Sequence, residues 1–397
     1  MVLWTGQAVS ALGTEITLLA FPLLVLSLTG SAAQAGIVAF FNTVPVLLLN
    51  LPGGVWVDRH DRRLIMAGAN LLGAVSIGGL AALLAVGDVP MAVIVCVAFV
   101  QGAAGTIFSL AEHGALPRVV PSGQLPDAVA QNEGRTFAAQ LIGPAVGGAL
   151  FGLGRAVPFL VDAVSYLLAA CSLALLRTPL QADRDRAPRT LMVQMTEGVR
   201  WLWHQPFLRD CALLVAVANF VWAGVALVLI VEAERQGASP GEIGLMLALL
   251  ASGGLLGALL APSVRRRLLP RTIVVGAFSL EAILIMLLGL RPHPFLLGGI
   301  AGLASLTVPP WNAVVIGARL VLTPDELIGR VNSAAALVAG SAVPVGALLG
   351  GVAAGAIGTR ATFVALGLVA VLVAASAATA PALRTGLNEL SAVGSSL

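Results

Sequence analysis

The sequence predicts an all-α integral membrane protein in which twelve transmembrane helices form two pseudo-symmetric six-helix bundles. Hydrophobic residues make up 58% of the 397 residues, and the mean hydropathy is +0.97. An average soluble domain is only about 45 to 50% apolar even when glycine is counted. Apolar segments of roughly 20 residues, the length that crosses a bilayer, recur twelve times, and one long polar connection divides them into two groups of six.

The twelve predicted spans define two bundles joined by a linker. The first span carries Glu15, has no basic residue ahead of it and is too long for a signal peptide, so we interpret it as retained. Residues 1–177 then form the N-terminal bundle, residues 207–381 the C-terminal bundle and residues 382–397 a cytoplasmic tail. The spans are expected at 3–28, 33–57, 64–86, 90–111, 136–154, 156–176, 207–231, 240–262, 272–290, 294–318, 331–357 and 361–381.

The long connection at 178–206 is expected to be a cytoplasmic linker. Its first half is polar and contains proline, which is typical of a loop. Its second half places Leu191, Met195, Val199 and Trp203 at intervals of four residues, which puts them on one side of a helix. We predict an amphipathic helix in the membrane interface there.

The orientation follows from the arginines, which are the only basic residues apart from histidine. If the N-terminus is cytoplasmic, most arginines fall in the inside loops and the tail. The positive-inside rule therefore predicts that both termini are cytoplasmic. The arginine-only bias and the 45 glycines are typical of a GC-rich bacterial genome, so we place the chain in a bacterial inner (cytoplasmic) membrane. The few arginines on the outside are Arg155, Arg235, Arg291 and Arg360.

Composition also excludes several kinds of chemistry. Without lysine the chain cannot form a P-loop or a Schiff base. The three cysteines form no CxxC pair and the four histidines no HExxH motif. The net charge of +3 is explained by topology rather than by nucleic acid. We therefore expect no enzyme, cofactor, metal site or nucleic-acid partner, and a monomer in the lipid bilayer.

The two halves look like copies of one another. PRVVPSGQLPDAV at 117–129 and ARLVLTPDELIGRV at 318–331 share a basic residue, a turn rich in proline and aspartate and a following glycine-rich span. Internal repeats of this kind are typical of transporters whose substrate site lies between the repeats.

Two motifs carry a family resemblance. The loop after the second span reads GVWVDRHDRR at 54–63, which resembles the GxxxDRxxRR/K signature of the major facilitator superfamily. In the fifth span, Gly134 is followed after eight residues by GPAVGG at 143–148, which is similar to the antiporter motif of drug:proton exporters. PLLVLSLTGS, FGLGRAVPFLVDAVSYL and EGVRWLWHQPFLRD resemble the macrolide-efflux and siderophore-exporter branch.

The resemblance implies the major facilitator fold and a secondary active transporter. Such a protein would export small hydrophobic or cationic compounds (a drug, an antibiotic or a siderophore-like compound) by proton antiport with alternating access. Its partners would be the substrate, protons and lipid. Proton-coupled import of a small polar nutrient is the main alternative, and a non-transporting sensor is a further one. Few charged residues in the spans argue against import, and the absence of a large soluble domain argues against a sensor.

The resemblance further implies a conformational latch, which would tie the loop motif to the start of span 11 in one state and release it in the other. The alternative is that the charges only enforce topology, although Asp58 would then have no use. Asp61 departs from the family's usual glycine and has no assigned role. Gly54 is expected to let one helix approach another closely. The latch residues would be Gly54, Asp58, Arg59, Arg62, Arg63 and Arg330.

Small residues spaced by four predict further close helix contacts. Such pairs occur at Gly253 and Gly257 and at Gly346 and Gly350. In the antiporter motif Pro144 favours a kink because it interrupts the helix hydrogen bonds. The residues of that motif are Gly134, Gly143, Pro144, Gly147 and Gly148.

Acidic residues inside spans are the candidates for proton coupling, because an ionisable group there is costly and serves a function by default. Glu15 lies near the middle of the first span and is the first candidate; the alternative is a satisfied structural acid. Glu281 is equally deep in span 9, a span that is peripheral in the family. Asp162 follows Pro158 in the first turns of span 6, where a helix N-terminus favours an anion, so we expect a structural role. Glu133 and Arg135 could pair locally.

Amides and tryptophans on spans 4, 7 and 10 are the candidates for substrate binding, because the family lines its cavity with these spans and with span 1. Amphipathic aromatic rings with a few amides suit a bulky, mostly apolar ligand. The alternative for each residue is helix packing. The candidates are Gln101, Asn219, Trp222, Trp311 and Asn312, the last two beside a break at Pro309-Pro310.

Overall fold

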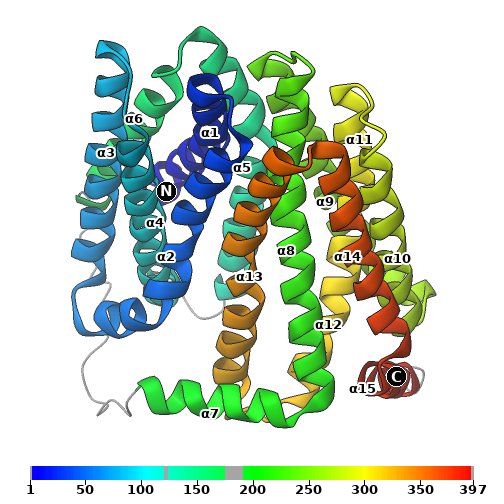
Figure 1. Ribbon diagram of the computed structural model, residues 1–397. Helices are drawn as coiled ribbons and strands as arrows, with labels where there is room; N and C mark the ends of the chain where they lie inside the picture. The colour runs from blue at the N-terminus through cyan, green and yellow to red at the C-terminus, as the bar shows by residue number, and fades with distance from the viewer. Residues whose placement is uncertain (1, 120–123, 175–190, 395–397) are drawn as a thin grey trace. The chain divides into compact units, whose positions relative to one another are not determined.

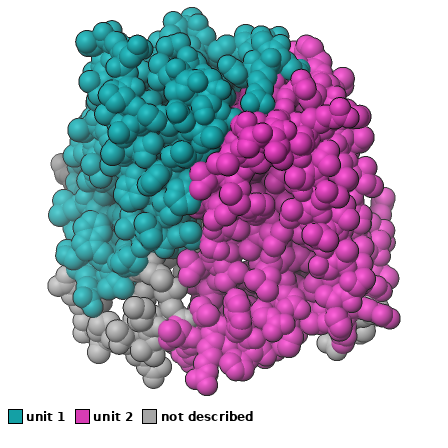
Figure 2. All heavy atoms as spheres, viewed as in Figure 1, with its two compact units in different colours: residues 1–187, 233–248 teal, residues 188–232, 249–397 magenta. Residues whose placement is uncertain are grey.

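The computed structural model describes residues 2–119, 124–174 and 191–394 (Figure 1). Within these residues, twelve candidate spans are long and apolar enough to cross a membrane, as predicted from the sequence. The contacts divide the chain into two units (Figure 2): unit 1 comprises residues 1–187 and 233–248, and unit 2 comprises residues 188–232 and 249–397.

The first six spans are single helices, and all lie in unit 1. Helix α1 packs against α5 and α6, α2 packs against α4, and α3 packs against α4 and α6. The six helices are α1 (Val2–Thr29), α2 (Ala32–Arg59), α3 (Arg62–Val86), α4 (Met91–Val119), α5 (Leu125–Leu153) and α6 (Val157–Ala174).

The second set of spans has one interruption. Span 10 consists of two helices, because the chain breaks at Leu306 and Thr307, just before the two prolines that predicted a break. The seven helices of these spans are α8 (Pro206–Arg235), α9 (Pro240–Arg267), α10 (Pro270–Leu288), α11 (Pro294–Ser305), α12 (Val308–Leu322), α13 (Ile328–Ala356) and α14 (Thr359–Thr379).

The second half of the predicted linker forms helix α7 (Leu191–His204), which runs across the end of α13 within unit 2 (Figure 1). The face that packs on α13 holds Gly198 and Leu202, and Leu202 is completely buried. Trp203, from the predicted apolar stripe, is 46% exposed, and the interfacial position of the helix stays a prediction. The side chains of Leu191 and Met195 lie outside the described residues.

The predicted tail is helical where the structure describes it. Helix α15 (Pro381–Gly394) packs against α10 and α14. Leu383 and Leu387 are buried in the same apolar core as Cys211 of α8, and Gly386 lies against the ring of Phe207. The C-terminal segment is therefore part of the packed body of unit 2.

Glycines hold several of these helices close together, as the spacing predicted. A Cβ atom at Gly253 would collide with the backbone of Gly302, and one at Gly257 with the backbone of Leu306. The second predicted pair lies on α13, where Gly346 meets the backbone of Phe220 in α8 and its partner, four residues on, meets Gly224. Side chains larger than hydrogen would force these helix pairs apart.

Candidate functional site

The arginines of the loop motif fasten helices of unit 1 to one another. Arg62 forms an ion pair with Asp58 at 3.1 Å and donates to the carbonyl of Gly114 in α4 at 2.5 Å. Arg63 donates to the carbonyls of Leu173 and Ala174 at the end of α6, at 2.9 and 2.5 Å. The contacts of Arg63 are favourable because the last carbonyls of a helix, here those of α6, lack partners within the helix.

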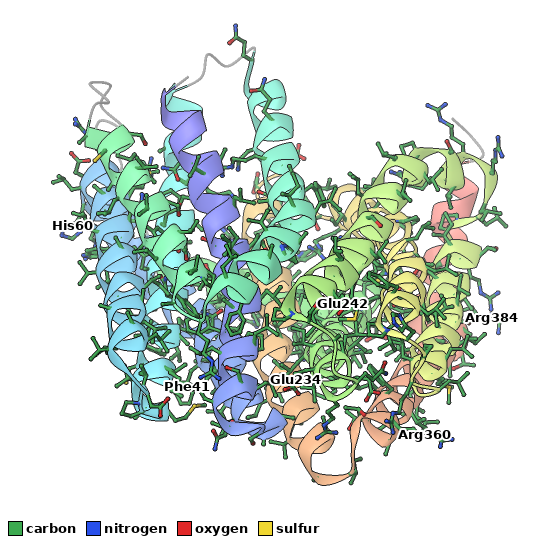
Figure 3. All side chains as sticks on the ribbon, turned by 90° about the horizontal axis from the view of Figure 1, so that it is seen from above. Phe41, His60, Glu234, Glu242, Arg360 and Arg384 are labelled. Atoms are coloured by element: carbon green, nitrogen blue, oxygen red, sulfur yellow. The ribbon has the colours of Figure 1, made fainter. Side chains whose placement is uncertain are left out.

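Two residues of this loop have positions that the motif did not reveal. Asp61, which had no assigned role, caps α3: its carboxylate accepts from the backbone N–H groups of Arg63 at 2.8 Å and Leu64 at 3.4 Å. Among the described residues, a Cβ atom at Gly54 would meet nothing within 4 Å, so the close helix contact expected there stays a prediction. The neighbouring Gly53 makes that contact, against side chains of α4. His60 points away from the helices of unit 1 (Figure 3).

Arg330, the predicted latch partner at the start of α13, lies beside α7. It forms an ion pair with Glu197 at 2.6 Å, and a Cβ atom at Gly198 would lie 2.5 Å from its backbone oxygen. Both contacts are within unit 2. The two ends of the predicted latch, Asp58 and Arg330, thus each have an ion-pair partner in their own unit, and a latch between them stays a prediction.

The antiporter motif and Glu15 meet in the structure. A Cβ atom at Gly143 would collide with the Cβ of Glu15, and one at Gly147 would lie 3.0 Å from the backbone oxygen of Ile16. Gly148 faces the first turn of α9, which clusters with unit 1. Gly134 has nothing within 4 Å of its Cβ position. The motif therefore sets the spacing of α5 against α1 at the predicted coupling residue.

Glu15 lines a cavity of about 210 Å³ in unit 1, here called the Glu15 cavity. Within it Glu112 and Arg135 form an ion pair at 3.0 Å, so the predicted local pairing of Arg135 with Glu133 is wrong. Several buried polar atoms make no hydrogen bond within the described residues, among them Gln7 Nε2, Asn70 Nδ2 and Arg135 Nε. The polar residues lining the cavity are Gln7, Ser10, Thr14, Glu15, Asn70, Glu112, Arg135, Thr136 and Tyr166.

A larger cavity of about 330 Å³, here called the polar cavity, lies between α1, α2, α4 and α6. The predicted substrate residue Gln101 lines it, as does Asp162. Hydroxyl and amide groups make up most of the remaining polar lining. The polar residues are Thr14, Thr17, Asn42, Thr43, Asn50, Gln101, Thr106, Ser109, Asp162 and Tyr166.

The predicted site residues of unit 2 lie outside both cavities. Glu281 in α10 is buried and accepts from the hydroxyl of Thr307 at 2.7 Å and from the indole N–H of Trp311 at 3.1 Å. The Trp311 ring also packs against the Phe278 ring, with centroids 4.8 Å apart and the ring planes tilted by 38°. Thr307 and Trp311, at and after the break in span 10, therefore both donate hydrogen bonds to the carboxylate of Glu281. Proton coupling by Glu281 stays a prediction.

The other predicted substrate-binding residues, on α8 and α12, differ in their contacts. Asn219 donates to the carbonyl of Ala339 at 2.9 Å, which joins α8 to α13. The buried indole N–H of Trp222 lies near the carboxylate of Glu281, without reaching good hydrogen-bond geometry within the described residues. Asn312 is half-buried. Helix packing accounts for Asn219, and substrate binding by all three residues stays a prediction.

One buried ionic cluster escaped the sequence reasoning. Glu232, at the end of α8, is completely buried; it accepts from Arg291 Nε at 2.9 Å and from the hydroxyl of Thr359 at the start of α14. The three residues lie in separate loops and helix ends, far apart in sequence. The one sequence feature that could have indicated this cluster is Glu232, an acidic residue directly after the predicted span 207–231. The described residues contain no group of three histidine, cysteine or acidic residues that could hold a metal ion.

The sequence matches a family model and named efflux proteins over nearly its whole length. A family model described as transmembrane secretion effector matches residues 1–392. The chain is 30% identical over 383 residues to a multidrug efflux pump, Tap, of Mycolicibacterium fortuitum, covering 94% of this chain and 93% of that protein. It is 24% identical over 380 residues to macrolide efflux protein A of Streptococcus pyogenes, covering 94% and 93%.

Solved structures share the fold at low sequence identity. A bacterial homologue of the human lysosomal transporter Spinster, solved in an inward-facing and unoccupied conformation, matches with a TM-score of 0.72 and 16% identity over 98% of this chain and 96% of that one. The nucleoside transporter NupG matches with a TM-score of 0.75 and 12% identity, over 94% and 97%. At these identities the likeness concerns the fold alone.

Proposed function

Because this chain belongs to the transmembrane secretion effector family of the major facilitator superfamily, we propose that it exports small hydrophobic or cationic compounds across the bacterial cytoplasmic membrane in exchange for protons. The observation that carries the proposal is the contact between Glu15 and Gly143, beside a cavity lined with polar groups. The names of the relatives, a multidrug efflux pump and a macrolide efflux protein, support drugs as the substrate class.

Glu15 is suited to carry the exchanged proton. A carboxyl group in a span is stable when it is neutral or has partners, and the Glu15 cavity supplies polar groups on its walls. The membrane potential contributes about 2.3 kcal/mol per charge per 100 mV. A tenfold concentration ratio costs about 1.4 kcal/mol, so for a neutral substrate one proton supports a gradient well above tenfold. Exchange of one proton for a singly charged cation moves no net charge, and the pH gradient alone drives it.

Alternating access would use the loop motif as its latch, with both termini in the cytoplasm and the protein working as a monomer. In one state Asp58 would meet the N-terminal end of α13, where a negative charge is favourable. In the other state it keeps its ion pair with Arg62 while Arg330 keeps Glu197. Exchange between these partners would keep Asp58 and Arg330 each beside an opposite charge in both states.

The test is dye transport in everted membrane vesicles, comparing the wild type with Glu15→Gln. An exporter in everted vesicles accumulates dye when a proton gradient is applied, and we expect Glu15→Gln to abolish the proton-linked part. Glu133→Gln is the matched control, because Glu133 is exposed and outside both cavities. Undiminished proton-linked flux in Glu15→Gln would exclude Glu15 as the proton-coupling residue. Loss of dye from energised wild-type vesicles would indicate that the protein imports the dye into cells instead.

A further inference from the structure

The polar cavity contains a carboxylate whose partners are all neutral. Asp162 is completely buried; its Oδ2 accepts from the hydroxyl of Thr17 at 2.6 Å and its Oδ1 from that of Ser165 at 3.1 Å. No basic side chain pairs with it in the part of the chain that the structure describes. Glu112 and Glu232, by contrast, each have an arginine. A carboxylate within the membrane is costly without a positive partner.

The same cavity contains a buried amide whose hydrogen-bonding groups are not fully used. Gln101 is only 6% exposed; its amide interacts with the hydroxyl of Tyr166, but neither its Nε2 nor its Oε1 reaches good hydrogen-bond geometry within the described residues. A Cβ atom at Gly73 would be 3.3 Å from both Gln101 Oε1 and the Tyr166 ring. Buried amides are nearly always fully hydrogen-bonded, so an amide with unused donor and acceptor capacity on a cavity wall indicates a group that a ligand can complete.

The size and lining of the polar cavity limit the chemical class of ligand that it can bind. A volume of about 330 Å³ is in the range of small-molecule sites. Among the described residues, Asp162 is the only acidic residue on the wall, no basic residue lines it, and Tyr166 is the other titratable group. The remaining polar groups, such as Asn42, Thr43 and Ser109, donate and accept hydrogen bonds without charge. This arrangement favours a ligand with one positive charge.

We propose that the polar cavity binds the positively charged group of an organic cation, with Asp162 as its counter-ion and Gln101 and the Tyr166 ring as orienting contacts. The assignment rests on the proposed export function and names the site for one substrate class. It replaces the structural role that the position of Asp162 near a helix N-terminus suggested.

The position of this site also explains how a cation and a proton could be exchanged. The polar cavity and the Glu15 cavity share Thr14, Gly105 and Tyr166, and the hydroxyls of Thr14 and Tyr166 lie 3.1 Å apart. A positive charge beside Asp162 favours release of the Glu15 proton, and a proton on Glu15 weakens cation binding by the same factor. The other charged groups facing Glu15, Glu112 and Arg135, already neutralise each other.

The experiment measures binding of ethidium, a cationic dye, to the purified full-length protein in nanodiscs. We expect Asp162→Asn to raise the Kd at least tenfold, because a hydrogen-bonded charge partner is lost. Ser165→Ala is the matched control: it removes a hydrogen bond from the same carboxylate but lies outside the cavity lining, so the Kd should change less than threefold. Gln101→Glu adds a second negative charge and should lower the Kd.

Thermal unfolding of each variant separates loss of the site from loss of the fold. A folded Asp162→Asn with wild-type Kd would overturn the proposal. If that variant does not fold, an unchanged Kd in Gln101→Glu would do so. Transport of the neutral dye N-phenyl-1-naphthylamine separates this proposal from the export function. Failure of the wild type to export either dye would refute export and leave the ethidium site to the binding assay, whereas export of the neutral dye by the wild type together with an unchanged ethidium Kd in a folded Asp162→Asn would refute the site and leave export intact.

Discussion

The contact between Gly143 and Glu15 allows a quantitative test of the antiporter motif. In Gly143→Ala the new methyl group would collide with the Cβ of Glu15 and lie 3.4 Å from its carbonyl carbon. Neither atom belongs to a flexible side-chain end, so α1 and α5 must separate. Overpacking of this kind typically costs about 1 to 3 kcal/mol.

Gly134→Ala is an internal control from the same motif and the same helix. Its Cβ would meet nothing within 4 Å. Both substitutions remove the same backbone freedom, an effect of about 0.5 to 1 kcal/mol in favour of alanine. The difference between the two variants therefore isolates the helix contact, and we expect Gly143→Ala to be less stable than Gly134→Ala by about 1 to 3 kcal/mol.

The assay is reversible unfolding of the purified protein in mixed detergent micelles, together with proton-linked dye flux in everted vesicles. Gly143→Ala should lose flux severalfold because Glu15 is displaced, whereas Gly134→Ala should keep it. Equal stability of the two variants would refute the contact as the reason for the glycine. A destabilised Gly143→Ala with normal flux would show that the contact is structural and that Glu15 does not depend on it.

Two further predictions concern the loop motif and the linker helix. Asp61→Ala should lower the free energy of unfolding by about 1 kcal/mol through loss of the α3 cap, whereas Asp61→Asn should be nearly neutral; equal losses in unfolding experiments would contradict capping. Glu197→Gln releases Arg330 from a partly exposed ion pair worth about 0.5 to 1 kcal/mol. It should change the labelling rate of a reporter cysteine in the polar cavity two- to fivefold, and an unchanged rate would indicate that Arg330 does not exchange partners with Asp58.

The helices and much of their packing could be predicted because each depends on local sequence. Twelve apolar segments gave twelve spans, and the paired prolines marked the interruption of span 10. Glycines spaced by four predicted contacts that hold at Gly253 and Gly346. The Asp61 cap was also within reach, since an aspartate just before an apolar helical run is a usual N-cap.

Partners across the bundle could not be predicted in the same way. Residues two apart on a helix do not face each other, which is why Arg135 reaches Glu112 on another helix rather than Glu133. One residue rotates a helix face by about 100°, so the motif alone could not tell Gly53 from Gly54. The neutral surroundings of Asp162 depend on α1 and α6 meeting, and no spacing in the sequence encodes that.

The docking of α15 has a practical consequence for handling the protein. Of the three cysteines, Cys211 is the buried one, and it shares its core with Leu383 and Leu387 of α15. A chain cut before α15 loses two side chains that cover this thiol. Reaction of Cys211 with a maleimide is therefore a built-in gauge of whether the C-terminal helix is seated, which makes it a useful check on truncations, tags and detergents before any transport is measured.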